Sequence, residues 1–164
     1  SPYERAVEAN QAGVDFFLSI HRNSYPTDNE VMGVESLIYD LSGLKYQMAQ
    51  EINEQLETVG FVDLGVKARP NLVVLKRTRM PAVLVEAGFI NSDTDNELFD
   101  SNFQDIAQAI ATGVLDTLEN AGVLKNRKRR WNRRSTVFRS DCSGTGTMQR
   151  GSRKHWKIED FRHI

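Results

Sequence analysis

The sequence predicts an α/β layered domain with a mostly parallel or mixed central sheet that helices cover on both faces. Short apolar runs without strict polar alternation, such as residues 14–21 and 82–86, indicate strands that are buried on both sides. Longer segments between such runs carry apolar residues at every third or fourth position, which is the period of an amphipathic helix. Strands and helices that alternate along a chain are typical of layered α/β domains.

The predicted elements begin with a helix whose start has the residues of a capping box. Ser1 stands at the N-cap, Pro2 at the first helical position and Glu4 at the third. Further along, an apolar stripe with a four-residue repeat predicts a second helix that ends at Gly60. The expected elements in order are helix 1–12, strand 14–21, strand 34–39, helix 44–60, strand 72–75, strand 82–86 and helix 102–119.

Charge divides the chain into two parts that the net value of −1 conceals. Residues 1–124 contain 8 Lys and Arg against 19 Asp and Glu, a balance of −11, whereas residues 125–164 contain 13 against 3, a balance of +10. The helical pattern stops at Gly122, immediately before the basic segment. We therefore expect a folded domain over 1–124 and a separate basic tail over 125–164.

Composition excludes several classes of protein. No run of 18 or more apolar residues is present, so no membrane span is expected, and the first residues lack the pattern of a signal peptide. The single cysteine, Cys142, cannot form an internal disulfide and offers no ligand spacing of the structural-zinc kind. No glycine-rich phosphate loop follows a predicted strand.

Two polar residues within apolar strands are the main candidates for chemistry. Glu86 lies inside the run 81–90, where an ionised carboxylate is costly unless it is paired, hydrogen-bonded or beside a metal. His21 ends another apolar strand, and if the two strands are parallel and adjacent, both residues lie at strand ends, where active sites of such sheets gather. This arrangement suggests a metal ligand and a base. The alternatives are a hydrogen-bonded or solvated histidine and a glutamate paired with an arginine such as Arg77.

Asn23 and Glu35 are secondary candidates. Asn23 follows His21 and either contacts a substrate or shapes the polar turn. Glu35 is the second residue of the strand 34–39 and either supports the site or pairs with a cation on a neighbouring strand.

Two motifs carry a resemblance to a known family. The strand end SIHRN at residues 19–23 and the strand MPAVLVEAGFIN at residues 80–91 occur in this order about sixty residues apart. With the helix before them and the helix after them, they resemble the zinc-dependent N-acetylmuramoyl-L-alanine amidases that cut bacterial peptidoglycan. The likeness covers about residues 1–122. Lys76 departs from the arginine usual in the family, which keeps the charge but loses bidentate contact.

The resemblance implies a function and a set of roles. The implied reaction is hydrolysis of the amide between N-acetylmuramic acid and L-alanine of the stem peptide, with Zn²⁺ as cofactor, His21 as the last of three zinc ligands and Glu86 as the catalytic carboxylate. Asn23 is the candidate for substrate contact. The family's first histidine and its glutamate ligand precede the region where this chain begins, so we expect the C-terminal share of a catalytic domain that lacks its opening strand. The alternative function is a catalytically inactive peptidoglycan-binding fragment.

The implied setting is outside the cytoplasm, in the cell wall, in the periplasm or secreted, with peptidoglycan as the partner and no nucleic acid. The sequence does not fix the oligomeric state. The basic tail is either the product of a shift in reading frame or a disordered anchor for anionic wall polymers. A third function class, a nucleic-acid binder that uses this tail, is disfavoured by the acidic first part.

Overall fold

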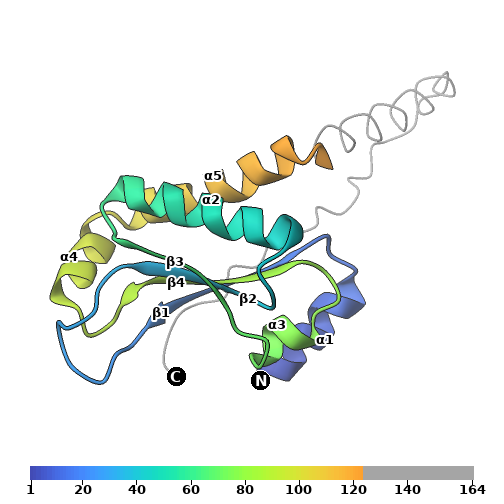
Figure 1. Cartoon of the computed structure of the whole chain (residues 1–164), viewed down its shortest axis with the longest axis horizontal. Helices are drawn as coiled ribbons and strands as arrows, with labels where there is room; N and C mark the ends of the chain where they lie inside the picture. The colour runs from blue at the N-terminus through green and yellow to red at the C-terminus, as the bar shows by residue number, and fades with distance from the viewer. Residues whose placement is uncertain (124–164) are drawn as a thin grey trace, which may run out of the picture. The chain divides into compact units, whose positions relative to one another are not determined.

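The computed structural model describes residues 1–123, and the predicted tail over 125–164 lies outside the described residues. Helices and strands alternate along this part of the chain (Figure 1). The elements are α1 (Pro2–Ala12), β1 (Phe17–Asn23), β2 (Val34–Ile38), α2 (Gly43–Val59), β3 (Asp63–Ala68), α3 (Val73–Arg77), β4 (Ala82–Phe89), α4 (Asp93–Ser101) and α5 (Phe103–Asn120).

The sheet is mixed, with strand order β1-β4-β2-β3. β1 pairs with β4 in parallel, β2 pairs with β3 in parallel, and β2 and β4 are antiparallel to each other. The predicted α/β class and the mixed sheet are therefore confirmed. Because β4 lies between β1 and β2, its residues have register partners on both sides.

One face of the sheet is covered by α2 and α5, which lie together above the strands (Figure 1). Their contact is close at Gly113, where an added Cβ would lie 2.8 Å from the Cα of Ile52. The apolar stripe predicted for the second helix is buried here, and the helix ends at Gly60 as expected. The buried apolar residues of this layer are Val34, Ile38, Met48, Ala49, Ile52, Leu56, Val83, Val85, Ile106, Ala109, Ile110, Val114 and Leu118.

The other face is covered only in part, by α3 and by α1, which packs on α3 (Figure 1). Ser1 caps α1 with the predicted capping box. The side chain of Asn10 connects α1 to the end of α3. Its amide group donates to the carbonyl oxygen of Arg77 at 2.8 Å, and its Oδ1 accepts from the backbone amide of Arg79 at 2.8 Å. This layer covers the half of the face that carries Leu37 and Leu84. The remaining half is not covered by α3.

The predicted strand over 72–75 is wrong, since residues Val73–Arg77 form the short helix α3. Val74 and Leu75 are buried against the sheet, whereas Val73 is exposed. A short apolar run has no period that separates a strand from one helical turn.

A buried carboxylate joins α4 to the sheet. Asp95 is 1% exposed, and its Oδ2 accepts from the amides of Gly33 at 2.9 Å and Phe89 at 2.8 Å. Ser92 caps α4 by accepting from the Asp95 amide. A carboxylate that accepts charge-assisted hydrogen bonds from two amides holds the start of β2 and the end of β4 together.

In the part of the chain that the structure describes, none of the helices combines the length and the apolar character needed to cross a bilayer.

Candidate active site

A row of three ionisable side chains crosses the sheet. His21 on β1 is the register partner of Glu86 on β4, and Glu86 is in turn the register partner of Glu35 on β2. Register partners share a face, so all three side chains lie on one side of the sheet. Leu84 and Leu37, which are also register partners, lie on this same face and pack against α3. The row and α3 are thus on the same face of the sheet, at different positions along the strands. The row therefore lies on the part of that face on which α3 does not pack.

An irregularity in β4 lies directly beside the row. The register between β1 and β4 shifts after the pair of His21 and Glu86, so that two residues of β4, Ala87 and Gly88, oppose one residue of β1. Gly88 has φ of +82°, and a Cβ there would lie 3.0 Å from the Cβ of Asp95. Glycine adopts this backbone conformation without strain, and such bulges often redirect side chains next to sites. Directly after the bulge, the Phe89 amide donates to Oδ2 of Asp95, and β4 continues to Phe89.

The carboxyl group of Glu86 is in an environment that favours its neutral form. Burial, and to a lesser extent the negative charge of Glu35 opposite, together raise the pKa of Glu86 to about 7. Its Oε2 is buried and has no hydrogen-bond partner among the described residues. The predicted alternative, a pair with Arg77, is not formed within residues 1–123. A carboxylate with a pKa near neutrality is suited to taking up and returning a proton at physiological pH.

The imidazole of His21 is partly buried at the end of β1. Its Nε2 lies 2.7 Å from the hydroxyl oxygen of Ser19, which is two residues earlier on the same face. Burial lowers the pKa of His21 below its ordinary value, and the positive charge of Arg5 on α1 lowers it further. Both causes favour the neutral imidazole, which is the form that binds metals.

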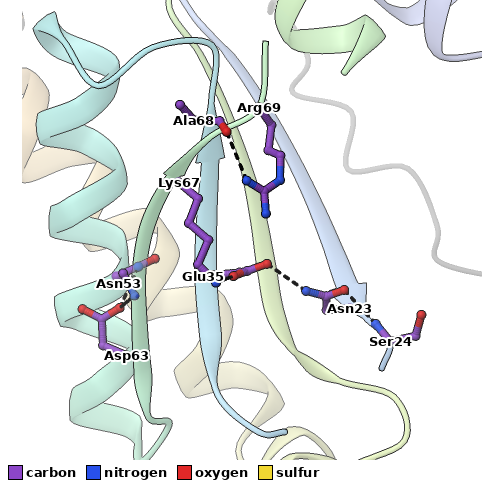
Figure 2. A network of polar contacts seen from close by, with 9 residues as sticks. Asn23, Ser24, Glu35, Asn53, Asp63, Lys67, Ala68 and Arg69 are labelled. Carbon is purple, nitrogen blue, oxygen red and sulfur yellow. Dashed lines mark hydrogen bonds and ion pairs between the residues drawn. The ribbon is translucent and has the colours of Figure 1, made fainter. Parts of the chain in front are cut away.

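A polar network holds the third member of the row (Figure 2). The Glu35 side chain accepts a hydrogen bond from the Asn23 amide group at 3.0 Å through Oε1 and forms an ion pair with Lys67 through Oε2. Asn23 also accepts from the Ser24 amide at 2.8 Å. Of the two alternatives for Glu35, the pair with a cation across strands is the one formed. Asn23 shapes the turn and also contacts Glu35.

A second network fixes the same strands from the opposite face (Figure 2). The hydroxyl of Ser36 donates to Oδ1 of the buried Asn53 on α2 at 2.7 Å, and Nδ2 of Asn53 donates to Asp63 at 2.8 Å. Asp63 also accepts from the Gly65 amide at 2.7 Å. These bonds tie β2 and the start of β3 to α2, and so they fix the position of the strand that carries Glu35.

Among residues 1–123, no three His, Cys, Asp or Glu side chains are grouped closely enough to hold a metal ion. His21, Glu86 and Glu35 share a row without forming such a group. A catalytic zinc needs three protein ligands and an open position. The described residues therefore do not fit a complete zinc centre, although His21 is a suitable single ligand.

The structure brings together the two main predicted residues, His21 and Glu86, and adds residues that sequence reasoning missed. The position of Glu35 opposite Glu86 follows from the antiparallel pairing of β2 with β4, which no local pattern indicates. Lys67 was missed because β3 was not predicted. Asp95 was also missed, although Ser92 three residues before it is a helix-start signal that could have located α4.

Comparison with protein families gives one match over most of the chain. The N-acetylmuramoyl-L-alanine amidase family model, Amidase_3, matches residues 1–116. The sporulation-specific N-acetylmuramoyl-L-alanine amidase of Bacillus subtilis (strain 168) is 40% identical over 125 residues, which are 74% of this chain and 46% of that protein. The N-acetylmuramoyl-L-alanine amidase CwlM of Bacillus licheniformis is 37% identical over 115 residues, 68% of this chain and 44% of that protein. The chain spans about half the length of the curated relatives it matches.

Solved structures give the same likeness. The structure of an N-acetylmuramoyl-L-alanine amidase from Clostridium difficile 630 superposes with a TM-score of 0.66 and 31% identity, covering 73% of this chain and 66% of that one. The catalytic domain of CwlV, an amidase from Bacillus (Paenibacillus) polymyxa, gives a TM-score of 0.64 and 29% identity over 73% of this chain and 66% of that one.

Proposed function

Since this chain belongs to the N-acetylmuramoyl-L-alanine amidase family, we propose that it serves the hydrolysis of the amide between the lactyl group of N-acetylmuramic acid and L-alanine in peptidoglycan. The observation that carries the proposal is the register pairing of His21 with Glu86 across β1 and β4. Peptidoglycan lies outside the cytoplasmic membrane, so the proposed place of action is extracytoplasmic.

We assign to Glu86 the transfer of a proton. Its carboxylate takes a proton from a water molecule whose oxygen attacks the lactyl carbonyl carbon. When the C–N bond breaks, Glu86 returns that proton to the nitrogen of L-alanine, so the products are a free lactyl carboxyl group and a free amine. The raised pKa of about 7 supports this role, because proton transfer is most efficient when the pKa of the group lies near the working pH.

We propose Zn²⁺ as the cofactor, with His21 as one of its ligands. Such a metal supplies a polarised carbonyl and a more acidic water molecule. The proposal rests on family membership and on the lowered pKa of His21. The described residues do not complete the ligand set, so no step of the proposed reaction is derived from the metal.

We propose that Asn23 acts at the edge of the site through Glu35. Its side chain is committed to the Glu35 carboxylate and to the Ser24 amide. A substrate contact by Asn23 therefore requires one of these hydrogen bonds to be exchanged.

The test is incubation of the chain with purified peptidoglycan, followed by mass spectrometry of the released peptides. New peptides that begin with a free L-alanine amine are expected. Release of sugar fragments without such peptides, or no release at all, contradicts the proposal.

A further inference from the structure

Two cations lie beside the row of ionisable residues and have no role in the proposed chemistry. Lys67 is on β3, and Arg69 follows two residues later, where its amide donates to the carbonyl oxygen of Ile38 and so continues the pairing with β2. Residues two apart along a strand share a face. Figure 2 shows Lys67 directed at Glu35, and the Arg69 side chain extending from the end of β3 on the same side.

The two side chains of the ion pair between Lys67 and Glu35 differ in their exposure to solvent. The Glu35 side chain is 8% exposed, whereas the Lys67 side chain is 40% exposed. Both oxygens of Glu35 are occupied, by Asn23 and by Lys67. An ammonium group has three donors, and within residues 1–123 Lys67 uses them only for Glu35. The ammonium group therefore has donors that the side chains of the described residues do not use.

The positive charge of Arg69 is not paired with an acidic side chain of the described residues. Its guanidinium group makes one hydrogen bond, to the carbonyl oxygen of Ala68 at 3.2 Å, and it forms no ion pair with an acidic residue in the described part of the chain. Residues 1–124 carry an excess of 11 negative charges. Two neighbouring cations at the end of β3, one of them in contact with Glu35, are thus an exception to the charge of this domain. They make this place attractive to an anionic group.

We propose that Lys67 and Arg69 form a subsite for a free carboxylate of the stem peptide, namely the α-carboxylate of a γ-linked D-glutamate directly after L-alanine. This proposal rests on the proposed function, because it takes the scissile amide to lie at Glu86. The preferred substrate then has D-glutamate with a free α-carboxylate at the second position of the stem peptide, and D-isoglutamine, whose α-carboxyl group is amidated, is disfavoured.

The dimensions of the sheet fit this assignment. Neighbouring strands are about 4.8 Å apart, and β2 lies between β4 and β3. Lys67 pairs with Leu37, two residues along β2 from Glu35, the partner of Glu86, so the backbones of Glu86 and Lys67 are roughly 12 Å apart. An extended peptide advances about 3.5 Å per residue, so the carboxylate of the second residue lies roughly 7 Å from the scissile bond. A lysine side chain that leans toward β2 spans the difference, and Lys67 leans this way because it contacts Glu35.

The experiment compares two probes that differ in one group, MurNAc-L-Ala-D-Glu and MurNAc-L-Ala-D-isoGln. Calorimetry measures their dissociation constants with the Glu86→Gln variant, so that no turnover intervenes. The acidic probe is expected to bind about tenfold more tightly, which is the order of one charge-assisted hydrogen bond. Glu35→Gln/Lys67→Met removes both members of the ion pair and leaves no buried carboxylate unpaired, and combined with Arg69→Gln it is expected to abolish the preference. Lys67→Arg is expected to retain it.

The matched control is Lys76→Met, a lysine in the last turn of α3, and this change is expected to leave the preference intact. Equal binding of the two probes to the starting protein overturns the subsite, as does a preference that survives loss of both cations. Binding of neither probe overturns it as well. Failure of the proposed function gives a different result. In that case the chain still discriminates between the two probes in calorimetry but does not hydrolyse peptidoglycan.

Discussion

His21 and Glu86 are direct register partners on the parallel strands β1 and β4. The two motifs that contain them are about sixty residues apart in the sequence, and the bulge at Gly88 follows immediately after the pair. Because antiparallel β2 lies on the other side of β4, Glu86 also has Glu35 as a partner. Glu86 thus lies between His21 and Glu35, and burial together with the negative charge of Glu35 raises its pKa.

The stability of the fold is expected to depend on pH through Glu86. Below about pH 4.5, its ordinary pKa, the carboxyl group is protonated in the folded and the unfolded chain. As the pH rises to about 7, the unfolded chain releases this proton before the folded chain does, so the contribution of Glu86 to folding decreases. Above about pH 7, the folded chain bears the full free-energy cost of holding Glu86 ionised in its buried position. Glu86→Gln removes it and should stabilise the protein at pH 8 by about 1–2 kcal/mol, a value reduced for the partial exposure of the group.

Urea denaturation of both proteins at pH 4.5 and at pH 8 measures this effect. The difference in free energy of unfolding between variant and starting protein should be larger at pH 8. Glu57→Gln, an exposed glutamate of α2, controls for the loss of a charge as such. A difference that is the same at both pH values, or larger at pH 4.5, contradicts the environment described for Glu86.

Zinc binding should distinguish the roles of His21 and Glu86. His21→Ala removes a proposed ligand and should weaken zinc binding by at least about tenfold, since even groups that only support metal ligands have effects of this size. Glu86→Gln should leave zinc affinity unchanged, because the proposed role of Glu86 is proton transfer. Competition with a chromophoric chelator measures both affinities. Equal affinity in His21→Ala would remove His21 from the ligand set, and loss of zinc in Glu86→Gln would make Glu86 a ligand.

Asp95 should be essential for stability although it lies outside the site. Asp95→Ala leaves the amides of Gly33 and Phe89 buried without their acceptor, and the expected loss is about 3 kcal/mol. Asp105→Ala on the exposed side of α5 is the matched control, with an expected change within about 0.5 kcal/mol. Chemical denaturation measures both values. A loss for Asp95→Ala no greater than that of the control would contradict the role described for this carboxylate.

The contact between α2 and α5 should not tolerate a methyl group at Gly113. Replacing glycine by alanine inside a helix stabilises by about 1 kcal/mol, but the new Cβ would lie 2.8 Å from the backbone of Ile52, and overpacking costs about 1–3 kcal/mol. The net effect of Gly113→Ala is therefore expected to be destabilising. Thermal unfolding measures it, and an increase in melting temperature would contradict the close approach of the two helices.

The sequence was sufficient for most helices of the domain and for the strands that carry the motifs. Helix starts and stops have local chemical causes, such as the cap at Ser1 and the glycine at Gly60, so α1 and α2 were predicted closely. β3 was missed because an edge strand with Gly65 and Lys67 has little apolar character. Residues Val73–Arg77 were assigned wrongly because burial of Val74 and Leu75, rather than a period, decides their conformation.

The candidate site was predictable only in part for a related reason. The motifs name His21 and Glu86, and the condition that their strands be parallel and adjacent is met. The place of Glu35 depends on strand order and register, which are set by packing over the whole sheet. Lys67 contacts Glu35 because β3 lies next to β2 in the sheet, and this strand order is not visible in the sequence. Long-range pairing of this kind leaves no local pattern in a single sequence.

The measurement that tests the central claim most directly is the appearance of free L-alanine amines when purified peptidoglycan is incubated with the protein and with its Glu86→Gln variant. We predict release of peptides that begin with L-alanine by the starting protein, and a loss of at least about 100-fold in the variant, because removal of a general base costs this much. The variant should retain its zinc affinity. Equal release by both proteins, or no release by the starting protein, would contradict the account.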